Sequence, residues 1–451
     1  MRDSKDFTMA IESKSIVIGI VGLGYVGLPT AISFYNNGFE VWGIDNSEVV
    51  IEQITENMNP TRDPSIDDMI PSSEDRRWNI TSSFPESIPN CDVIIVTVPT
   101  PINSEMGMDP TFVEEAGREI FSNIPRGSGK LVVLESTVYP GSTMEYWSPI
   151  IKENDLKPGI DIWIGYCPER HNPGDSENNI STVSRVVGCS DKSIGESLVL
   201  LYSQLTSGEV RYVGDIQVAE SSKLVENIQR DINIALVNEL ATILPELGVD
   251  VEEVLEAAST KWNFHRYTPG IGVGGHCIPV DPYFIIDQAK FQGLKANLVS
   301  SAREINESMP SFAFFQIKSI IGEHYSDLDR PPRVLIMGWS YKPNIGDLRE
   351  SPSLELHKLL SEDGFESFCF DPHVAQSDLP LGLESIEQID MAPQIDIVVL
   401  ATAHEEILSI DWNQLKKSMK KPIIYDGRRA LNLSYLKEEG WLTYAIGKPI
   451  N

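Results

Sequence analysis

The sequence lacks the features that mark several large classes of protein. No apolar run reaches the roughly 18 residues that a membrane helix needs, and residues 1–15 are polar, without the apolar centre of a secretory signal. The five cysteines are odd in number, scattered and in no CxxC arrangement, which argues against a disulfide framework and against a zinc site. We therefore expect a cytoplasmic protein that holds no metal.

Positive charge is also scarce. The chain has 36 Lys and Arg against 66 Asp and Glu, which gives a formal net charge of −30. Nucleic acids and anionic membranes are bound by a surplus of Lys and Arg, so neither is an expected partner. An anionic ligand would need local cations and backbone N–H groups that overcome the global field.

The 451 residues, 41% hydrophobic and 23% charged, are typical of a globular protein with two or three domains. Short β-branched runs alternate with helical segments from residue 15 to about 215, and again from residue 333. This alternation indicates parallel α/β sheets. Between them, residues 218–247 have a helical period without glycine, and residues 291–325 also look helical.

We therefore predict an α/β protein with two Rossmann-like, doubly wound domains joined by a long central helix and a helical middle region. The expected domains are 1–215, 216–328 and 329–451, with "YSDLDRPP" (325–332) at the second boundary. The helix 218–247 has more apolar surface than one domain edge would cover. We expect subunits to pair through it, at least as a homodimer.

The stretch "GLGYVGL" (22–28) follows an apolar strand and opens a helix. Gly22, Gly24 and Gly27 have the GxGxxG spacing, which allows a tight turn and brings a pyrophosphate to the helix N-terminus. Asp45 ends the next strand, 18 residues after Gly27, where a carboxylate accepts ribose hydroxyls and repels a 2′-phosphate. The pattern predicts binding of NAD rather than NADP.

A second glycine-rich stretch, "GIGVGGHCIPVDPYF" (270–284), places Cys277 behind two glycines and His276. A single cysteine is more often an inert, buried residue than a nucleophile. Here the glycines allow close approach of a ligand, and the prolines on either side of Asp281 stiffen the turn, as the positioning of a reactive thiol requires. We interpret Cys277 as a nucleophile.

Four polar residues of the long helix, Lys223, Asn227, Asp231 and Asn238, are spaced so that they share one face. A solvated stripe on an amphipathic helix is the simpler interpretation. Asn is a middling helix former, however, and two of them among apolar neighbours favour the polar lining of a cleft. In such a cleft Lys223 would anchor a developing oxyanion or act as a base.

These residues resemble the UDP-glucose/GDP-mannose dehydrogenase family of NAD-dependent four-electron oxidoreductases. The resemblance extends from about residue 15 to 447 and rests on "GLGYVGLP", "TVPTP" (97–101), "ESTVYPGST" (135–143), "CPER" (167–170), "ESSKLVEN" (220–227), "GVGGHCIPVDPYF", "WSYKPNIGDLRESP" (339–352), "DPHV" (371–374) and "DGRR" (426–429). Within the family, "KWNF" (261–264) and "GGHC" are similar to the branch that oxidises UDP-N-acetylhexosamines.

The resemblance implies that Cys277 forms a thiohemiacetal and then a thioester at the sugar's C6. Lys223 and Asn227 would bind the oxyanion, Asp281 and Lys223 would manage protons, and Thr137 and Glu169 would hold the water, with Glu169 a candidate base for hydrolysis. It also implies that domain 1–215 binds NAD, that 216–328 carries the cysteine loop and the dimer helix, and that 329–451 binds the UDP-sugar.

The remaining site residues follow from the same resemblance. The expected cofactor-binding residues are Gly22, Gly24, Tyr25, Val26, Gly27, Asp45, Thr100, Ser136, Thr137 and Arg349. The expected substrate-binding residues are Glu169, Arg170, Lys223, Asn227, Arg266, Gly274, Lys342 and Arg428. Both Lys261 and Arg266 stand ahead of the glycine run, where families of this kind use an arginine from a neighbouring subunit.

The expected function is oxidation of UDP-GlcNAc or UDP-ManNAc to the uronate. A UDP-glucose 6-dehydrogenase is the nearest alternative, with the same chemistry and a different pocket. A non-catalytic nucleotide-sugar sensor would not need Cys277, Lys223 and Asp281 together. A two-electron dehydrogenase that releases an aldehyde would leave Cys277 without a task.

Overall fold

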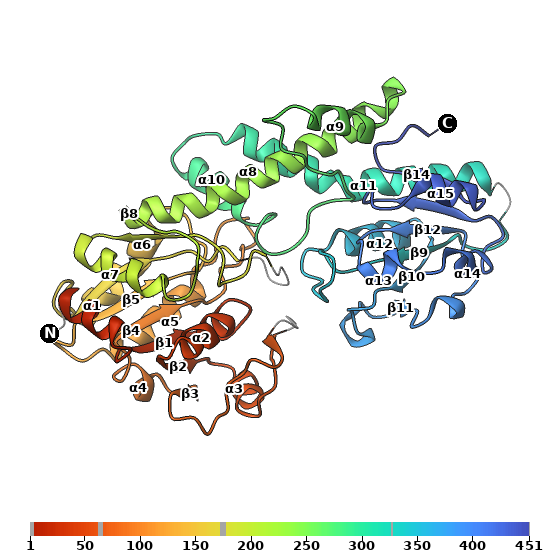
Figure 1. Ribbon diagram of the computed structural model, residues 1–451. Coiled ribbons are helices and arrows are strands. Elements are labelled where there is room, and N and C mark those ends of the chain that lie inside the picture. The colour runs from red at the N-terminus through yellow and green to blue at the C-terminus, as the bar shows by residue number, and fades with distance from the viewer. Residues whose placement is uncertain (1–3, 62–65, 172–176, 326–327, 451) are drawn as a thin grey trace. The chain divides into compact units, whose positions relative to one another are not determined.

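The computed structural model describes residues 4–61, 66–171, 177–325 and 328–450. Residues 326 and 327, in the expected boundary segment 325–332, lie outside this range. The chain divides into two compact units, one with Met1–Glu226 and Tyr283–Gln292, the other with Asn227–Pro282 and Gly293–Asn451 (Figure 1). Within the described residues, none of the helices combines the length and apolar character that crossing a membrane requires.

The first unit is built on an eight-stranded sheet with the order β3-β2-β1-β4-β5-β6-β7-β8. Its strands are β1 (Val17–Val21), β2 (Glu40–Ile44), β3 (Trp78–Thr81), β4 (Val93–Val96), β5 (Lys130–Leu134), β6 (Ile162–Tyr166), β7 (Arg185–Cys189) and β8 (Val210–Gly214). All neighbours are parallel except β6 and β7, which are antiparallel. The order reverses between β1 and β4, and in such sheets ligands bind at the carboxyl ends of the strands beside this switch point.

Helices connect these strands, as the alternation of apolar runs predicts. The connecting helices are α2 (Gly27–Asn36), α3 (Glu48–Thr55), α4 (Phe84–Ser87), α5 (Thr111–Ser122), α6 (Ser142–Glu153) and α7 (Lys192–Tyr202), and a further helix, α1 (Ser4–Glu12), precedes β1. β4 and β5 are buried along their whole length, because helices cover both faces of a doubly wound sheet. Side chains that favour helix N-termini start two of the helices: Ser47 caps α3 and Asp191 caps α7.

The second unit contains a six-stranded parallel sheet with the order β11-β10-β9-β12-β13-β14. The strands are β9 (Arg333–Met337), β10 (Glu366–Phe370), β11 (Glu384–Ser385), β12 (Ile397–Leu400), β13 (Ile423–Asp426) and β14 (Leu442–Ala445). In chain order this repeats the arrangement of β1 to β6. The connecting helices are α12 (Pro352–Glu362), α13 (Glu405–Leu408), α14 (Trp412–Lys416) and α15 (Leu433–Glu438). The predicted α/β class with two Rossmann-like domains is confirmed.

Helices dominate the middle of the chain. They are α8 (Ile216–Ile243), a 3₁₀ turn η2 (Pro245–Leu247), α9 (Val251–Ser259), α10 (Asp281–Phe291) and α11 (Asn297–His324). The helix predicted over 218–247 is thus an α-helix to Ile243, and Pro245 begins the 3₁₀ turn. Ser351 caps α12 ahead of Pro352, as the sequence predicts.

The face of α8 predicted to line a cleft is instead partly sealed. Asp231 and Asn238 are fully buried. The Asp231 carboxylate accepts hydrogen bonds from Arg303 Nη1 at 2.6 Å and from Asn306 Nδ2 at 2.8 Å. Asn238 donates to Asn306 Oδ1 at 2.8 Å and accepts from the backbone N–H of Gly270 at 2.9 Å. This half of the face therefore joins α8 to α11 and to the start of the glycine run.

Candidate active site

The first glycine loop lies between β1 and α2, at the switch point of the first sheet. Gly22 has a φ of 91°, in the region that favours glycine. A Cβ atom on Gly27 would lie 1.8 Å from the carbonyl oxygen of Gly22, whereas one on Gly24 would meet open space. Asp45 accepts the Leu23 N–H at 2.8 Å and is only partly buried. A glycine-rich loop, a helix N-terminus and an acidic residue at the end of β2 fit NAD.

The predicted residues after β4 and β5 meet at the same carboxyl edge of this sheet. Thr100 Oγ1 donates to the carbonyl oxygen of Thr137 at 2.7 Å, and Ser136 Oγ donates to that of Val98 at 2.6 Å. Parallel strands end on one side of the sheet, so these residues share that side with Gly22. The structure thus brings Thr100, Ser136 and Thr137 together.

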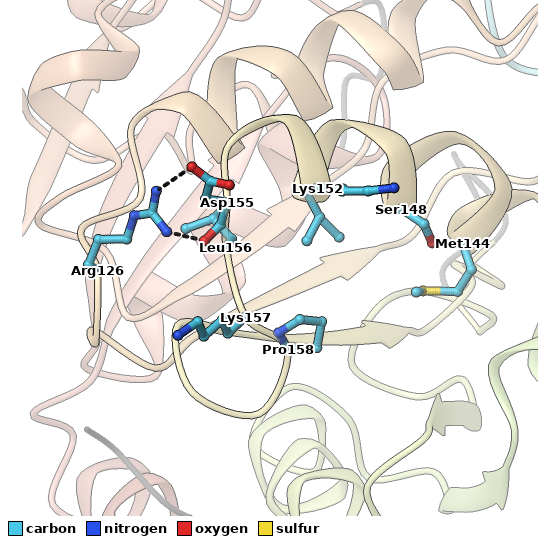
Figure 2. Close-up of a pocket in the computed structure, with 9 residues that line it drawn as sticks. Arg126, Met144, Ser148, Lys152, Asp155, Leu156, Lys157 and Pro158 are labelled. Carbon is cyan, nitrogen blue, oxygen red and sulfur yellow. Dashed lines mark hydrogen bonds and ion pairs between the residues drawn. The ribbon is translucent and has the colours of Figure 1, made fainter.

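A groove of about 620 Å³ lies at the opposite edge of this sheet (Figure 2). It is lined by Arg126, Met144, Ser148, Ile151, Lys152, Asp155, Leu156, Lys157 and Pro158. The segments 126–129 and 155–158 precede β5 and β6, so the groove is at the amino ends of these parallel strands. It therefore does not belong to the glycine-loop site.

Glu169 follows β6 and is buried, and its hydrogen bonds and ion pairs to described residues lie inside the first unit. Its Oε1 accepts the N–H groups of Arg170 and His171 at 2.6 and 2.7 Å, and its Oε2 pairs with Arg185. Burial by itself would raise the pKa of Glu169, but the Arg185 charge and the His171 donors outweigh it and hold that pKa well below its usual range. Near neutral pH this carboxylate is a weak proton acceptor.

Arg185 has a second carboxylate beside it that the site prediction omitted. Its Nη1 lies 3.7 Å from Glu135 Oε1, which also accepts the Tyr202 hydroxyl at 2.7 Å. Burial raises the pKa of Glu135 to about 7; Arg185 opposes this rise, and the Glu169 charge adds to it. Glu135 stands in the "ESTVYPGST" motif, whereas no local pattern marks Arg185.

The cysteine loop leaves one thiol accessible. Cys91, Cys167, Cys189 and Cys369 are buried, whereas Cys277 is partly exposed. The Cys277 carbonyl accepts the backbone N–H of Asp281 at 2.9 Å, which closes a turn directly before α10. This exposure is what a nucleophilic thiol requires.

Two of the predicted catalytic residues touch each other. The Asn227 side-chain amide donates to the buried carboxylate of Asp281 at 2.5 Å. Lys223 is partly buried and lies one helical turn before Asn227 on α8. Asp281 is thus held against the helix that carries Lys223 and Asn227.

The glycine run before Cys277 packs against the segment 339–352, which follows β9. A Cβ on Gly274 would lie 2.6 Å from Tyr341 Cβ, and one on Gly275 would lie 2.7 Å from the Tyr341 ring. The Gly275 N–H donates to the Arg349 carbonyl at 3.0 Å. These glycines allow close backbone contact within the protein, in addition to any role in binding a ligand.

The predicted ligand-binding cations differ in their surroundings. Arg349 pairs with Asp347, Arg266 with Glu252, and Arg170 with Glu226. Lys342 is partly exposed. Among the residues that the structure describes, no carboxylate forms an ion pair with Arg428, whose Nη1 would lie 2.7 Å from a Cβ on Gly270.

Comparison with known proteins agrees with this architecture. The NAD-binding domain of the UDP-glucose/GDP-mannose dehydrogenase family matches residues 16–206, its central domain matches 217–308 and its UDP-binding domain matches 335–433. The chain belongs to this family. As a member of it, the protein is an NAD-dependent sugar dehydrogenase, and NAD is its cofactor.

Relatives within the family cover nearly the whole chain. A UDP-N-acetyl-D-glucosamine 6-dehydrogenase of Pseudomonas aeruginosa is 34% identical over 94% of this chain and 98% of its own. A UDP-N-acetyl-D-mannosamine dehydrogenase of Methanocaldococcus jannaschii is 33% identical over 95% and 96%. The solved structure of a UDP-D-ManNAc dehydrogenase from Pyrococcus horikoshii has a TM-score of 0.84 at 32% identity, covering 96% of this chain and 99% of that one.

Proposed function

We propose that the protein oxidises the 6-hydroxymethyl group of a UDP-N-acetylhexosamine, UDP-GlcNAc or UDP-ManNAc, to the carboxylate. The names of relatives that match over more than nine tenths of the chain support this substrate class. The observation that carries the chemistry is the partly exposed Cys277 thiol, held in a turn whose Asp281 is bonded to Asn227.

Cys277 divides the four-electron oxidation into two similar steps. Two NAD molecules, bound one after the other, would each accept one of the two hydride ions that the overall reaction releases. After the first oxidation, the Cys277 thiolate adds to the C6 aldehyde and forms a thiohemiacetal. The second oxidation converts this adduct into a thioester, and water then attacks its carbonyl carbon. The C–S bond breaks, the sulfur leaves as thiolate, and the uronate is released.

Lys223 and Asn227 stabilise the oxyanion of the additions. An amide nitrogen has two N–H donors, and the bond to Asp281 uses one of them. The second N–H of Asn227 and the ammonium group of Lys223 remain for the negative oxygen, and donors fixed in advance are the largest source of such stabilisation. Asp281 thereby orients Asn227, and with Lys223 it manages the protons.

For the hydrolytic step we assign Thr137 and Glu169 to the water. The low pKa of Glu169 disfavours it as the proton acceptor, because an effective general base has a pKa near the working pH. Its charge, held by Arg185, suits the orientation of a water molecule instead.

Binding of the two ligands is assigned to separate domains. Thr100, Ser136 and Thr137 join the first glycine loop, with Tyr25, Val26 and Asp45, in holding NAD, to which Arg349 contributes charge. Lys342, Arg428, Arg170, Arg266 and Gly274 are assigned to the UDP-sugar. Arg428 fits a phosphate best, because its guanidinium forms no ion pair within the described part of the chain.

We also propose that subunits pair through α8, as a homodimer or a larger assembly. Val218, Val225, Leu236 and Ile243 are all exposed on this helix, and contiguous exposed apolar surface marks interaction sites. Light scattering that shows a monomer at working concentration would contradict this pairing.

The function is tested by measuring NADH release across purified UDP-GlcNAc, UDP-ManNAc and UDP-glucose. Two NADH per sugar, with an N-acetylhexosamine as the fastest substrate, is the expected result. A higher rate on UDP-glucose would show that UDP-glucose is the substrate. One NADH per sugar would show a two-electron oxidation and contradict the thioester mechanism. Binding of UDP-sugars without NADH release would show that the protein is a non-catalytic nucleotide-sugar sensor.

A further inference from the structure

The segment after β9 occupies the same place in its sheet as the first glycine loop does in its own. In the first unit, the acidic residue that ends β2, Asp45, accepts the Leu23 N–H. In the second unit, Asp371 directly follows β10 and accepts the N–H groups of Trp339 and Ser340 at 2.6 and 3.0 Å. In both units, therefore, an aspartate after the second strand accepts backbone N–H groups of the loop at the switch point, which is where ligands usually bind.

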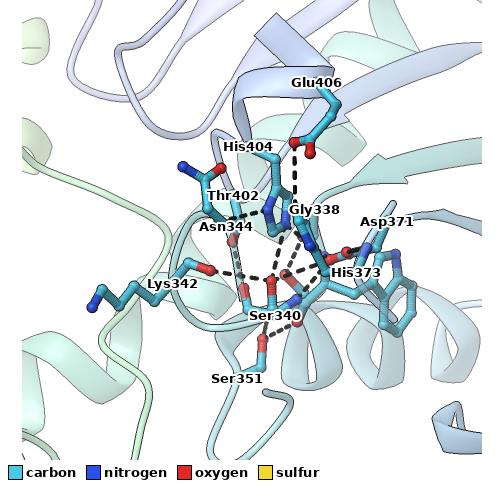
Figure 3. Close-up of polar contacts among 12 residues, drawn as sticks. Gly338, Ser340, Lys342, Asn344, Ser351, Asp371, His373, Thr402, His404 and Glu406 are labelled. Carbon is cyan, nitrogen blue, oxygen red and sulfur yellow. Dashed lines mark hydrogen bonds and ion pairs between the residues drawn. The ribbon is translucent and has the colours of Figure 1, made fainter. Parts of the chain in front are cut away.

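The second switch point is filled by protein, since His404 lies there with no exposed surface (Figure 3). Its Nδ1 accepts the Asn344 N–H at 2.9 Å, so the proton must be on Nε2. Nε2 lies 2.9 Å from Ser340 Oγ and 3.1 Å from Asp371 Oδ2. Because one nitrogen meets both groups, this is no nucleophilic triad, in which the two ring nitrogens have different partners.

The network fixes the segment 339–351 at several points along its length. Thr402 Oγ1 donates to the Ser340 carbonyl at 2.6 Å, and Ser351 Oγ donates to the Trp339 carbonyl at 2.6 Å. Asn344 has a φ of 62°, an uncommon conformation for a residue other than glycine. Such a conformation persists only where its surroundings hold it, and the His404 Nδ1 acceptor does so directly.

This segment is also the surface on which the glycine run lies. Tyr341 packs against Gly274 and Gly275, and the Arg349 carbonyl accepts the Gly275 N–H. Gly275 is two residues from Cys277. A shift of the segment would therefore move the thiol, and a displacement of about 1 Å in a reacting group costs on the order of a hundredfold in rate.

We propose that His404 is a positioning residue for Cys277, acting through Asn344 and Ser340, the segment 339–351 and the Gly275 N–H. The imidazole takes the place that a ligand has at such a switch point and makes the segment a rigid support for the cysteine loop. The catalytic consequence rests on the proposed function, whereas the effect on the thiol does not.

The test compares His404→Leu, His404→Asn and Ser340→Ala with the control His324→Gln. The first variant removes both nitrogens, and the second keeps an acceptor for the Asn344 N–H. His324 is likewise a histidine of the second unit; it is partly buried and bonds Tyr444 rather than the segment. Iodoacetamide alkylation of the native protein reports on Cys277, because the other four cysteines are buried.

We expect the alkylation rate of Cys277 to change at least about threefold in His404→Leu and less in His404→Asn, with wild-type rates in His324→Gln. On the productive UDP-sugar, kcat should fall about tenfold or more in His404→Leu, while the KM for NAD stays unchanged. If His404 only stabilised the fold, its substitution would lower the melting temperature, and the reactivity of the thiol at temperatures well below that melting point would not change.

Unchanged alkylation in His404→Asn and Ser340→Ala together with wild-type kcat would overturn the proposal, even if His404→Leu does not fold. If the wild-type protein releases no NADH from any UDP-sugar, the proposed function fails. The alkylation rates then still decide whether His404 positions Cys277.

Discussion

The side-chain amide of Asn227 and the carboxylate of Asp281 are joined by a 2.5 Å hydrogen bond, which ties α8 to the end of the cysteine loop. Asn227→Asp would place two carboxylates in contact, and like charges at this distance disfavour ionisation of both. We expect kcat to fall about a hundredfold, the usual effect of losing an oxyanion donor.

The exchange Asn227→Asp with Asp281→Asn is the matched control for this change. It restores one donor and one acceptor, so the melting temperature should recover. The catalytic activity should not recover, because the amide, now at position 281, would no longer face the oxyanion. Recovery of kcat in the double variant would show that only the bond matters and that Asn227 is no oxyanion donor.

Cys277→Ser should uncouple the two oxidations. A serine hydroxyl is a poor nucleophile without strong activation, whereas a thiol is partly ionised near neutral pH. We expect NADH formation to stop near one equivalent per sugar, or an ester adduct to accumulate, as measured by absorbance and intact-protein mass. Cys189→Ala, at a buried cysteine, should keep two equivalents. Two NADH per sugar in Cys277→Ser would refute the thioester.

Glu135→Gln should stabilise the protein at alkaline pH. The folded pKa of Glu135 is about 7, raised by burial from 4.5, so its contribution to the free energy of unfolding is present in full below 4.5 and is lost as pH rises through 7. Gln keeps an acceptor for the Tyr202 hydroxyl and cannot ionise. We expect the free energy of unfolding of the variant, relative to wild type, to increase by on the order of 2 kcal/mol when the pH is raised from 5 to 8.

Denaturant unfolding at the two pH values measures this gain. The matched control is Glu86→Gln, at an exposed carboxylate of the same unit, which should change stability by less than about 0.5 kcal/mol at either pH. A Glu135→Gln variant whose difference from wild type does not depend on pH would contradict the assignment.

Asn238→Ala should weaken the second unit. It leaves the Gly270 N–H and Asn306 Oδ1 without their partner, and each buried unsatisfied group costs about 1–3 kcal/mol. We expect a loss of about 2–4 kcal/mol in chemical denaturation. Asn233→Ala on the same helix removes only an exposed bond to Gln229 and should cost less than about 1 kcal/mol. Equal losses in both would contradict the role of Asn238.

Gly27→Ala should abolish NAD binding, because the added methyl group would lie 1.8 Å from the Gly22 carbonyl oxygen. Calorimetric titration with NAD measures the effect. Gly322→Ala adds the same methyl group in α11, where it would meet no described atom within 4 Å apart from its chain neighbours and the helix's own backbone. It should bind NAD normally and gain about 0.5–1 kcal/mol of stability. NAD affinity that is retained in Gly27→Ala would place the cofactor elsewhere.

Local patterns were enough to predict much of the fold. The glycine turn after β1, the period of α8 and the cap at Ser351 all depend on residues within about one or two helical turns of each other. The two Rossmann-like sheets follow from the alternation of strands and helices, since parallel strands need crossover connections.

The buried polar contacts could not be predicted in this way. Asp231 meets Arg303, and Glu169 meets Arg185, only because the sheet and the helix pair bring distant segments together. His404 is separated from Asn344 by 60 residues. Sequence spacing predicted that Asp231 shares a face with Lys223, but it could not show that α11 covers that part of the face.

The repeated strand order of the two sheets has a consequence for folding. A strand inserted into the wrong sheet would find parallel neighbours in the correct order, and such misassembly is a characteristic failure of tandem domains. The turns that leave β1 and β9 differ sharply, because the first is so tight that a Cβ on Gly27 would lie 1.8 Å from the Gly22 carbonyl oxygen, whereas the second carries the fully buried Trp339 and Ser340. An exchanged strand would bring the Trp339 indole to a place where a tight glycine turn must form, so this chain should refold from denaturant without domain-swapped aggregates.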